Sequence, residues 1–141
     1  MDSADLDRVI TDVLETAKNI AIVGMSDDLE RPSFRVGMYL KTHHYHIIPV
    51  NPNHADIKGI KSYPTISAIP QDIKIDVVDI FRKPADVFPH VREAVARGVK
   101  VIWMQRGIIN EEAASYARAN GSTVIMDRCM MGEYHKRHVQ P

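Results

Sequence analysis

The stretch Ile20–Val36, IAIVGMSDDLERPSFRV, decides the fold. It begins with the apolar run Ile20–Val23, whose β-branched residues predict a buried strand, and Gly24 predicts a tight turn where that strand ends. A polar loop over Met25–Arg31 follows, and Pro32 opens a helical pattern. A strand, a glycine-containing loop and a helix in this order form the first unit of a nucleotide-binding α/β fold. The loop amides and the positive end of the helix suit a phosphate.

The same alternation of strand and helix continues along the chain. Strands are predicted at Ile20–Val23, His46–Val50, Ile75–Phe81, Val99–Met104 and Thr123–Met126. Helices are predicted over 1–18 with Ser3 as N-cap, from Ser33 to His43 or His44, near Thr65–Ile69, and from the cap Asn110 to Gly121. The segment 54–70 is expected to be otherwise irregular, and 127–141 to be a polar C-terminal tail with a short helix.

Two prolines divide the region between the third and fourth strands. In one continuous helix from Pro84, Pro89 would lie inside it and cost about 3 kcal/mol. We therefore expect one turn over Pro84–Val87 and a separate helix that begins at Pro89 and ends before Gly98.

Strands that alternate with helices predict one doubly wound α/β domain over residues 1–141, with a mostly parallel sheet of five or six strands and helices on both faces. In such folds ligands bind beyond the carboxyl ends of the strands. We expect the site at four of these ends: Gly24-Met25-Ser26, Asn51-Pro52, Phe81-Arg82-Lys83 and Met104 to Gly107.

Composition limits the classes of partner. The 141 residues are 45% hydrophobic and 26% charged, as in a typical soluble domain. Eighteen basic and eighteen acidic residues cancel, so the chain lacks the broad basic face that nonspecific nucleic-acid binding needs. The single cysteine, Cys129, favours a reducing compartment, and no apolar run approaches the roughly 20 residues that span a bilayer. We expect a cytoplasmic protein without nucleic-acid or membrane partners; its protein partner is unknown, and the choice between monomer and homodimer stays open.

The first loop is not a dinucleotide fingerprint. Gly24 is followed by Met25 and Ser26, so G-x-G-x-x-G is absent, and Asn51 stands where a carboxylate holds the ribose in a NAD site. Asn51 can still hydrogen-bond a ribose or an adenine edge. Cations that could meet phosphates, or could be solvated surface charge, are Arg31, Arg35, Lys58, Arg82 and Lys83.

No catalytic or metal-ligating group is predicted. The histidines at 43–46 and the residues at 133–138 lack cysteine partners and structural-site spacing. A serine triad has no G-x-S-x-G motif here. A phosphoacceptor role for Asp79 lacks the acidic pair expected after the first strand.

Seven segments resemble, in this order, the small single-domain CoA-binding proteins, which are related to the N-terminal CoA-binding domain of the succinyl-CoA synthetase α subunit. The segments are IAIVGMS, RPSFRV, IIPVNPN, KSYPTI, VVDIFRKP, VIWMQRGIINEEAA and VIMDRC. The resemblance covers about Ile20 to Cys129 and implies a Rossmann-like fold with the CoA nucleotide over the strand ends. It implies that Gly24, Ser26 and Ser33 face the diphosphate, that Asn51, Pro52 and Lys58 line the nucleotide side, and that Phe81, Arg82 and 105–107 complete the cleft.

Together with the strand-end and charge arguments, this gives a predicted cofactor-binding set: Gly24, Met25, Ser26, Arg31, Pro32, Ser33, Asn51, Pro52, Lys58, Phe81, Arg82, Lys83, Gln105 and Gly107. The leading hypothesis is a protein that binds coenzyme A or an acyl-CoA without a reaction of its own. The alternatives are an enzyme that uses NAD(P) or an acyl-CoA, and a regulatory protein that senses a nucleotide. We also hypothesise that Cys129 forms a mixed disulfide with the thiol of bound CoA.

Overall fold

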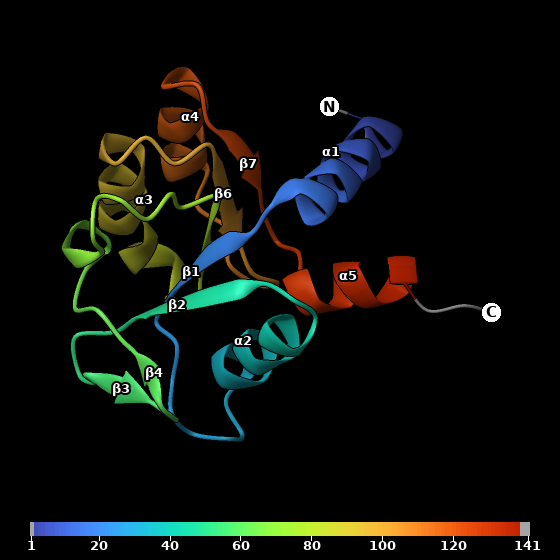
Figure 1. Ribbon diagram of the computed structural model, residues 1–141. Helices are drawn as coiled ribbons and strands as arrows, with labels where there is room; N and C mark the ends of the chain where they lie inside the picture. The colour runs from blue at the N-terminus through green and yellow to red at the C-terminus, as the bar shows by residue number, and fades with distance from the viewer. Residues whose placement is uncertain (1, 139–141) are drawn as a thin grey trace.

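A parallel five-stranded sheet forms the centre of the computed structural model, which describes residues 2–138 (Figure 1). Its strands are β1 (Asn19–Val23), β2 (His46–Val50), β5 (Val77–Ile80), β6 (Val101–Met104) and β7 (Thr123–Ile125). The order across the sheet is β2-β1-β5-β6-β7, with every pair parallel. The chain thus moves outward from β1 in one direction to β2 and in the other to β5, and this reversal lies between β1 and β5. The predicted doubly wound, Rossmann-like α/β fold is confirmed.

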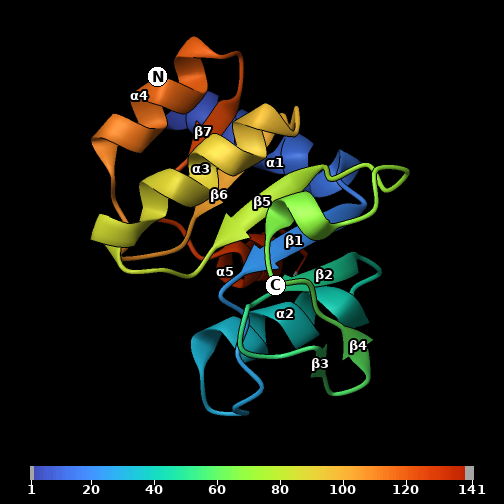
Figure 2. The same cartoon turned by 90° about the vertical axis from the view of Figure 1, so that its left-hand side faces the viewer.

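Helices cover both faces of the sheet (Figures 1 and 2). The α-helices are α1 (Ser3–Thr16), α2 (Pro32–Thr42), α3 (Val87–Ala96), α4 (Glu111–Ala119) and α5 (Met130–His138), with 3-10 turns η1 (Ile66–Ala68) and η2 (Pro84–Asp86). The core against α3 and α4 receives Ala21 and Val23 of β1, and the core against α1, α2 and α5 receives Ile20 and Ile22. Alternate residues of a strand point to opposite faces, so a strand that is apolar throughout fills both cores.

Proline and cap positions fix where several elements begin. Pro49 lies in β2, an edge strand, where a missing N–H is tolerated. The N-cap of α1 is Asp2, whose carboxylate accepts from the Asp5 amide, and not Ser3 as predicted. Helix α3 begins at Val87 and not at Pro89. The prediction was wrong because Pro89 falls in the first turn, where the amides have no intrahelical acceptor to lose.

The segment expected to be irregular contains a small antiparallel hairpin, β3 (Asp56–Ile57) and β4 (Ile60–Lys61). Its two-residue turn is Lys58-Gly59, both with positive φ, as a type I′ turn requires. Strands of two residues carry no alternation pattern, so the sequence did not reveal them.

The segment predicted as a C-terminal tail is mostly helix α5, which buries Met130 and Glu133. The Arg137 guanidinium donates to Glu133 Oε1 at 2.8 Å, to Thr11 Oγ1 of α1 at 2.8 Å and to the Asp7 carboxylate. The contacts with α1, together with the burial of Met130 and Glu133, hold α5 against the rest of the domain. The last part of the predicted tail, 139–141, lies outside the described residues. No helix within residues 2–138 combines the length and the apolar character needed to cross a bilayer.

Candidate functional site

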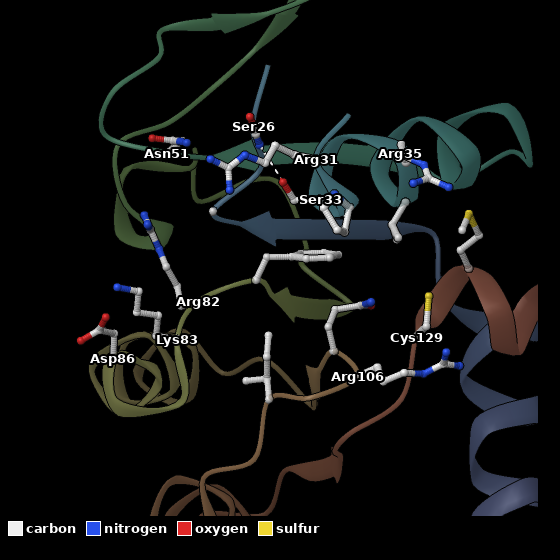
Figure 3. Close-up of a pocket in the computed structure, with 17 residues that line it drawn as sticks. Ser26, Arg31, Ser33, Arg35, Asn51, Arg82, Lys83, Asp86, Arg106 and Cys129 are labelled. Atoms are coloured by element: carbon white, nitrogen blue, oxygen red, sulfur yellow. Dashed lines mark hydrogen bonds between the residues drawn. The ribbon is translucent and has the colours of Figure 1, made fainter. Parts of the chain in front are cut away.

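A cleft of about 850 Å³ opens at the carboxyl ends of the strands, where the direction of the chain across the sheet reverses (Figure 3). This is the place where open α/β sheets bind ligands. It is lined by Gly24, Ser26, Arg31, Pro32, Ser33, Arg35, Val36, Asn51, Phe81, Arg82, Lys83, Asp86, Gln105, Arg106, Ile108, Cys129 and Met131.

Gly24 forms the floor of the cleft. Its N–H donates to Val50 O of β2 at 2.8 Å, and its φ of +84° is in the left-handed region that favours glycine. A Cβ atom at this position would overlap the carbonyl oxygen of Phe81, which follows β5. The glycine therefore lets three strand ends meet without a side chain between them.

The loop after β1 is held open toward the cleft by short-range hydrogen bonds. Ser33 Oγ accepts from Ser26 N at 2.9 Å (Figure 3), and Ser26 Oγ accepts from Asp28 N at 3.0 Å. Ser33 belongs to the first turn of α2, whose N-cap residue Arg31 makes no side-chain cap bond and whose first turn has no acidic residue. The positive end of α2 is thus available to an anion from outside the chain.

Met25 and Asn51 set the position of this loop from beneath. Met25 is fully buried, and a Cβ atom at Gly37 of α2 would lie 2.6 Å from its Cε. Because Gly37 has no side chain, α2 can lie close against Met25 and against Ile22 of β1. Asn51 Nδ2 donates to Met25 O at 2.9 Å and Asn51 Oδ1 accepts from Asn53 N at 2.9 Å, so this amide joins the loops after β1 and β2.

The cleft carries an excess of positive charge. Its lining holds five cations, Arg31, Arg35, Arg82, Lys83 and Arg106, against one acid, Asp86. Of these five cations, only Arg31 has an ion-pair partner within residues 2–138, the Asp28 carboxylate at 4.0 Å. Arg82 Nε is buried and has no hydrogen-bond partner in the part of the chain that the structure describes. Burial, and then the charge of Arg82, lower the pKa of His90 on α3, so the field of this guanidinium reaches a neighbouring helix.

The opposite end of the cleft is built from the end of β6 and the start of α5. Gln105 Oε1 accepts from Met130 N at 3.0 Å, which caps α5. Cys129 precedes that helix and is half-buried, with its backbone oxygen accepting from Glu133 N at 2.9 Å. Gly107 N donates to Asp127 Oδ1 at 2.7 Å. The thiol therefore borders the cleft on a segment that several hydrogen bonds hold in place.

The structure brings most of the predicted site residues together. Those that line the cleft are Gly24, Ser26, Arg31, Pro32, Ser33, Asn51, Phe81, Arg82, Lys83 and Gln105. Four lie outside its lining: Met25 is buried beneath the loop, Pro52 is exposed beyond Asn51, Lys58 occupies the hairpin turn, and Gly107 is bound to Asp127.

Several lining residues were outside the predicted set. Asp86 and Ile108 lie a few residues after the ends of β5 and β6, so counting more residues after each strand would have included them. Val36 and Met131 lie on helices, and their approach to the cleft depends on tertiary packing. Within residues 2–138, no cluster of three or more His, Cys, Asp or Glu side chains is placed to hold a metal. Histidines of the two groups pack against tyrosines instead; His43 stacks on Tyr39 at 4.1 Å.

Known proteins share both the sequence and the fold. The family described as CoA binding domain matches residues 18–135. The uncharacterized protein YneT of Bacillus subtilis is 36% identical over 121 residues, 86% of this chain and 88% of that one. The ADP-forming acetate–CoA ligase II of Archaeoglobus fulgidus is 33% identical over 86 residues, which are 59% of this chain but 12% of the ligase. A solved structure of a hypothetical protein from Pyrococcus horikoshii has a TM-score of 0.88 at 40% identity, covering 93% of this chain and 90% of that one.

Proposed function

This chain belongs to the CoA binding domain family, and we propose that it binds coenzyme A or an acyl-CoA in the cleft at the carboxyl ends of the strands. The observation that carries the proposal is a surplus of cations, four of the five without an ion-pair partner within residues 2–138. They surround the turn at Gly24 and the N-terminus of α2, which has no side-chain cap. CoA is a polyanion, and such a cleft supplies both side-chain charge and the positive end of a helix for its phosphates.

The diphosphate is proposed to lie over Gly24 and Ser26, against the first turn of α2. Ser33 supports this seat because its hydroxyl already fixes the Ser26 amide. Arg31, Arg82 and Lys83 line the same side of the cleft, where they would neutralise phosphate charge.

The two ends of the ligand are assigned to the two ends of the cleft. Figure 3 shows Asn51, Arg82 and Lys83 on one side, and Arg35, Arg106 and Cys129 on the other. The nucleotide is proposed on the Asn51 side, because the phosphate-binding cations gather there. The pantetheine arm then crosses toward β6 and α5 and places its thiol near Cys129.

Binding without catalysis is the proposed role. Within residues 2–138 the titratable groups that line the cleft are the five cations, Asp86 and Cys129, so a single carboxylate and no histidine is at hand for acid–base catalysis. The free thiol supports a reducing, cytoplasmic compartment, which we infer from cysteine usage.

Titration calorimetry with CoA tests the proposal. Wild type is expected to bind, and Ser26→Tyr is expected to lose affinity by about tenfold or more, because the larger side chain fills the diphosphate seat. Ser115→Tyr is the matched control, since Ser115 is exposed on α4 away from the cleft. An affinity that Ser26→Tyr leaves unchanged would contradict the proposed seat. Mass spectrometry of small molecules released from freshly purified protein would identify a bound acyl group directly.

A specific observation favours testing the thiol as well, since Cys129 lines the cleft. With CoA disulfide as the oxidant, the Cys129 thiolate would attack one sulfur, form a mixed disulfide with CoA and release the other CoA as a thiolate. Intact mass should show one CoA adduct on wild type and none on Cys129→Ser. Wild type without an adduct would end this hypothesis and leave reversible CoA binding untouched.

A further inference from the structure

Arg106 is a cation whose role phosphate binding does not explain. It follows β6 and its side chain is exposed to the cleft. A Cβ atom built on Gly132, in the first turn of α5, would lie 3.9 Å from Arg106 Nη2 and 3.9 Å from Cys129 Sγ. The guanidinium and the thiol therefore border the same small space. No residue within 2–138 makes an ion pair or a hydrogen bond with this guanidinium.

The chemistry of CoA separates its charges from its thiol. All its phosphates lie in the nucleotide half, and a long uncharged pantetheine arm leads from them to the sulfur. In the sheet, β6 is two strands away from β1, whose loop forms the proposed phosphate seat. The guanidinium of Arg106 is thus placed at the thiol end, where free CoA offers it no phosphate.

An acyl group attached to the sulfur would extend into the space beside Arg106. We propose that Arg106 selects an acyl-CoA whose acyl group ends in a carboxylate, an inference that rests on the proposed CoA-binding function. A guanidinium can donate two parallel hydrogen bonds to a carboxylate, which gives it orientation as well as charge. Met131 and Ile108 of the cleft lining supply apolar surface for the methylenes between the thioester and that carboxylate.

Arg35 adds positive charge at the same end. It lies in the first turn of α2, is exposed, and lines the cleft on the side where Figure 3 shows Arg106 and Cys129. Within residues 2–138 the cleft has a single acidic lining residue, Asp86, which Figure 3 shows at the opposite side beside Lys83. The field at the thiol end therefore favours an anionic acyl group over a neutral one of the same length.

Calorimetric Kd values for three ligands test this inference: CoA, butyryl-CoA and succinyl-CoA, the last two with four-carbon acyl groups. We expect wild type to bind succinyl-CoA about tenfold more tightly than butyryl-CoA. Arg106→Gln should remove that difference, and the affinities for CoA and for butyryl-CoA should fall much less than the affinity for succinyl-CoA. Arg118→Gln, which removes an exposed cation from the last turn of α4, should keep the difference.

The outcomes separate this inference from the function on which it rests. If wild type binds CoA but shows equal Kd values for the two acyl-CoAs, the carboxylate selection is wrong and CoA binding stands. If Arg106→Gln weakens CoA as much as succinyl-CoA, Arg106 contacts the body of CoA and the inference is overturned. If no ligand binds, both proposals fall. Should Arg106→Gln not fold, the wild-type comparison of malonyl-, succinyl- and glutaryl-CoA with propionyl- and butyryl-CoA still decides, since equal affinity throughout overturns the inference.

Discussion

A large depression lies at each end of the parallel strands. The larger one lies at their amino ends, whereas open α/β sheets bind their ligands at the carboxyl ends. The cleft at the carboxyl ends of the strands has about 850 Å³, and a groove at their amino ends has about 980 Å³. The groove is also rich in charge, with Arg8, Asp12, Lys74, Asp76, Arg97 and Lys100 among its lining residues.

What distinguishes the two is how their polar groups are used. In the groove, the Arg97 guanidinium donates to the carbonyl oxygens of residues 66, 69, 70 and 73, at 3.0, 2.8, 2.7 and 3.2 Å. Asp76 Oδ2 accepts from the amides of Lys18 and Asn19, and Asp76 Oδ1 lies 3.8 Å from Lys74 Nζ. In the cleft, four of the five cations have no ion-pair partner within residues 2–138, and Arg31 has only Asp28 at 4.0 Å. Hydrogen-bonding capacity that the chain leaves unused marks a binding site better than volume does.

The largest expected effect comes from filling the floor of the cleft. Gly24→Ala should destabilise the protein by about 3 kcal/mol or more, because the left-handed backbone costs an alanine about 1–2 kcal/mol and the new Cβ also overlaps Phe81 O. Gly59→Ala is the matched control, with a φ of +85° but open space around it, and should cost the backbone contribution alone. Denaturant unfolding measures both, and equal losses would show that the strand ends can move apart.

The second prediction compares an arginine of the groove with an arginine of the cleft. Arg97→Gln should lower the free energy of unfolding by about 2 kcal/mol, because several carbonyls lose their donor, and should leave the Kd of CoA unchanged. Arg82→Gln should raise that Kd by about tenfold with little loss of stability. Urea unfolding and calorimetry on both variants give the four values. If Arg82→Gln lowered the free energy of unfolding as much as Arg97→Gln, the proposed difference between a structural groove and a ligand-binding cleft would be wrong.

Asp79 gives a third test, in the strand between the two depressions. Asp79 is paired with Ile22 and Trp103 in the sheet register, and its carboxyl is fully buried without a hydrogen-bond partner among residues 2–138. Burial raises its pKa well above the usual value. The unfolded chain therefore loses this proton at a lower pH than the folded one. The contribution of the neutral carboxyl to the free energy of unfolding is therefore fully present below about pH 4. It decreases as the pH rises toward the pKa of the folded state. Asp79→Asn should flatten this decline in unfolding experiments at several pH values; an unchanged pH dependence would place its cause elsewhere.

The smallest expected effect is at the loop that holds the phosphate seat. Ser33→Ala removes the acceptor of the Ser26 amide, which should weaken CoA binding about fivefold, the value of one neutral hydrogen bond. Ser67→Ala removes a comparable exposed serine contact to Glu93 away from the cleft and should leave the Kd unchanged. Equal Kd values for wild type and Ser33→Ala would show that the loop keeps its shape without this bond.

The fold was predictable because its information is local. Mostly apolar runs of four to seven residues, each followed by glycine, a charged residue or a polar amide residue, identified every strand of the main sheet. The rule that parallel strands present their carboxyl ends at one edge then located Ser26, Asn51 and Arg82 without knowledge of the strand order. Chain connectivity and backbone sterics carry these inferences.

The rest of the cleft depends on contacts between distant segments. Helix α5 is positioned by contacts with distant segments, among them Gln105 at its N-terminus and the bond from Arg137 to α1, so no local pattern indicated that Met131 would reach the cleft. Lys58 was placed near the nucleotide, but the unexpected hairpin holds it in its turn. Asn51 has its amide hydrogen-bonded to the neighbouring loops, a use that the residue type alone does not predict.

The contact of Met25 with Gly37 has a consequence for the sensitivity of the protein to oxidation. The thioether fills the space into which a Cβ on the helix would project, so loop and helix share one sulfur as their spacer. Methionine sulfoxide is bulkier and polar, and would not fit there. Oxidation of this buried thioether would thus misalign the loop after β1 without changing any residue that lines the cleft, and enzymatic reduction of the sulfoxide would restore the loop.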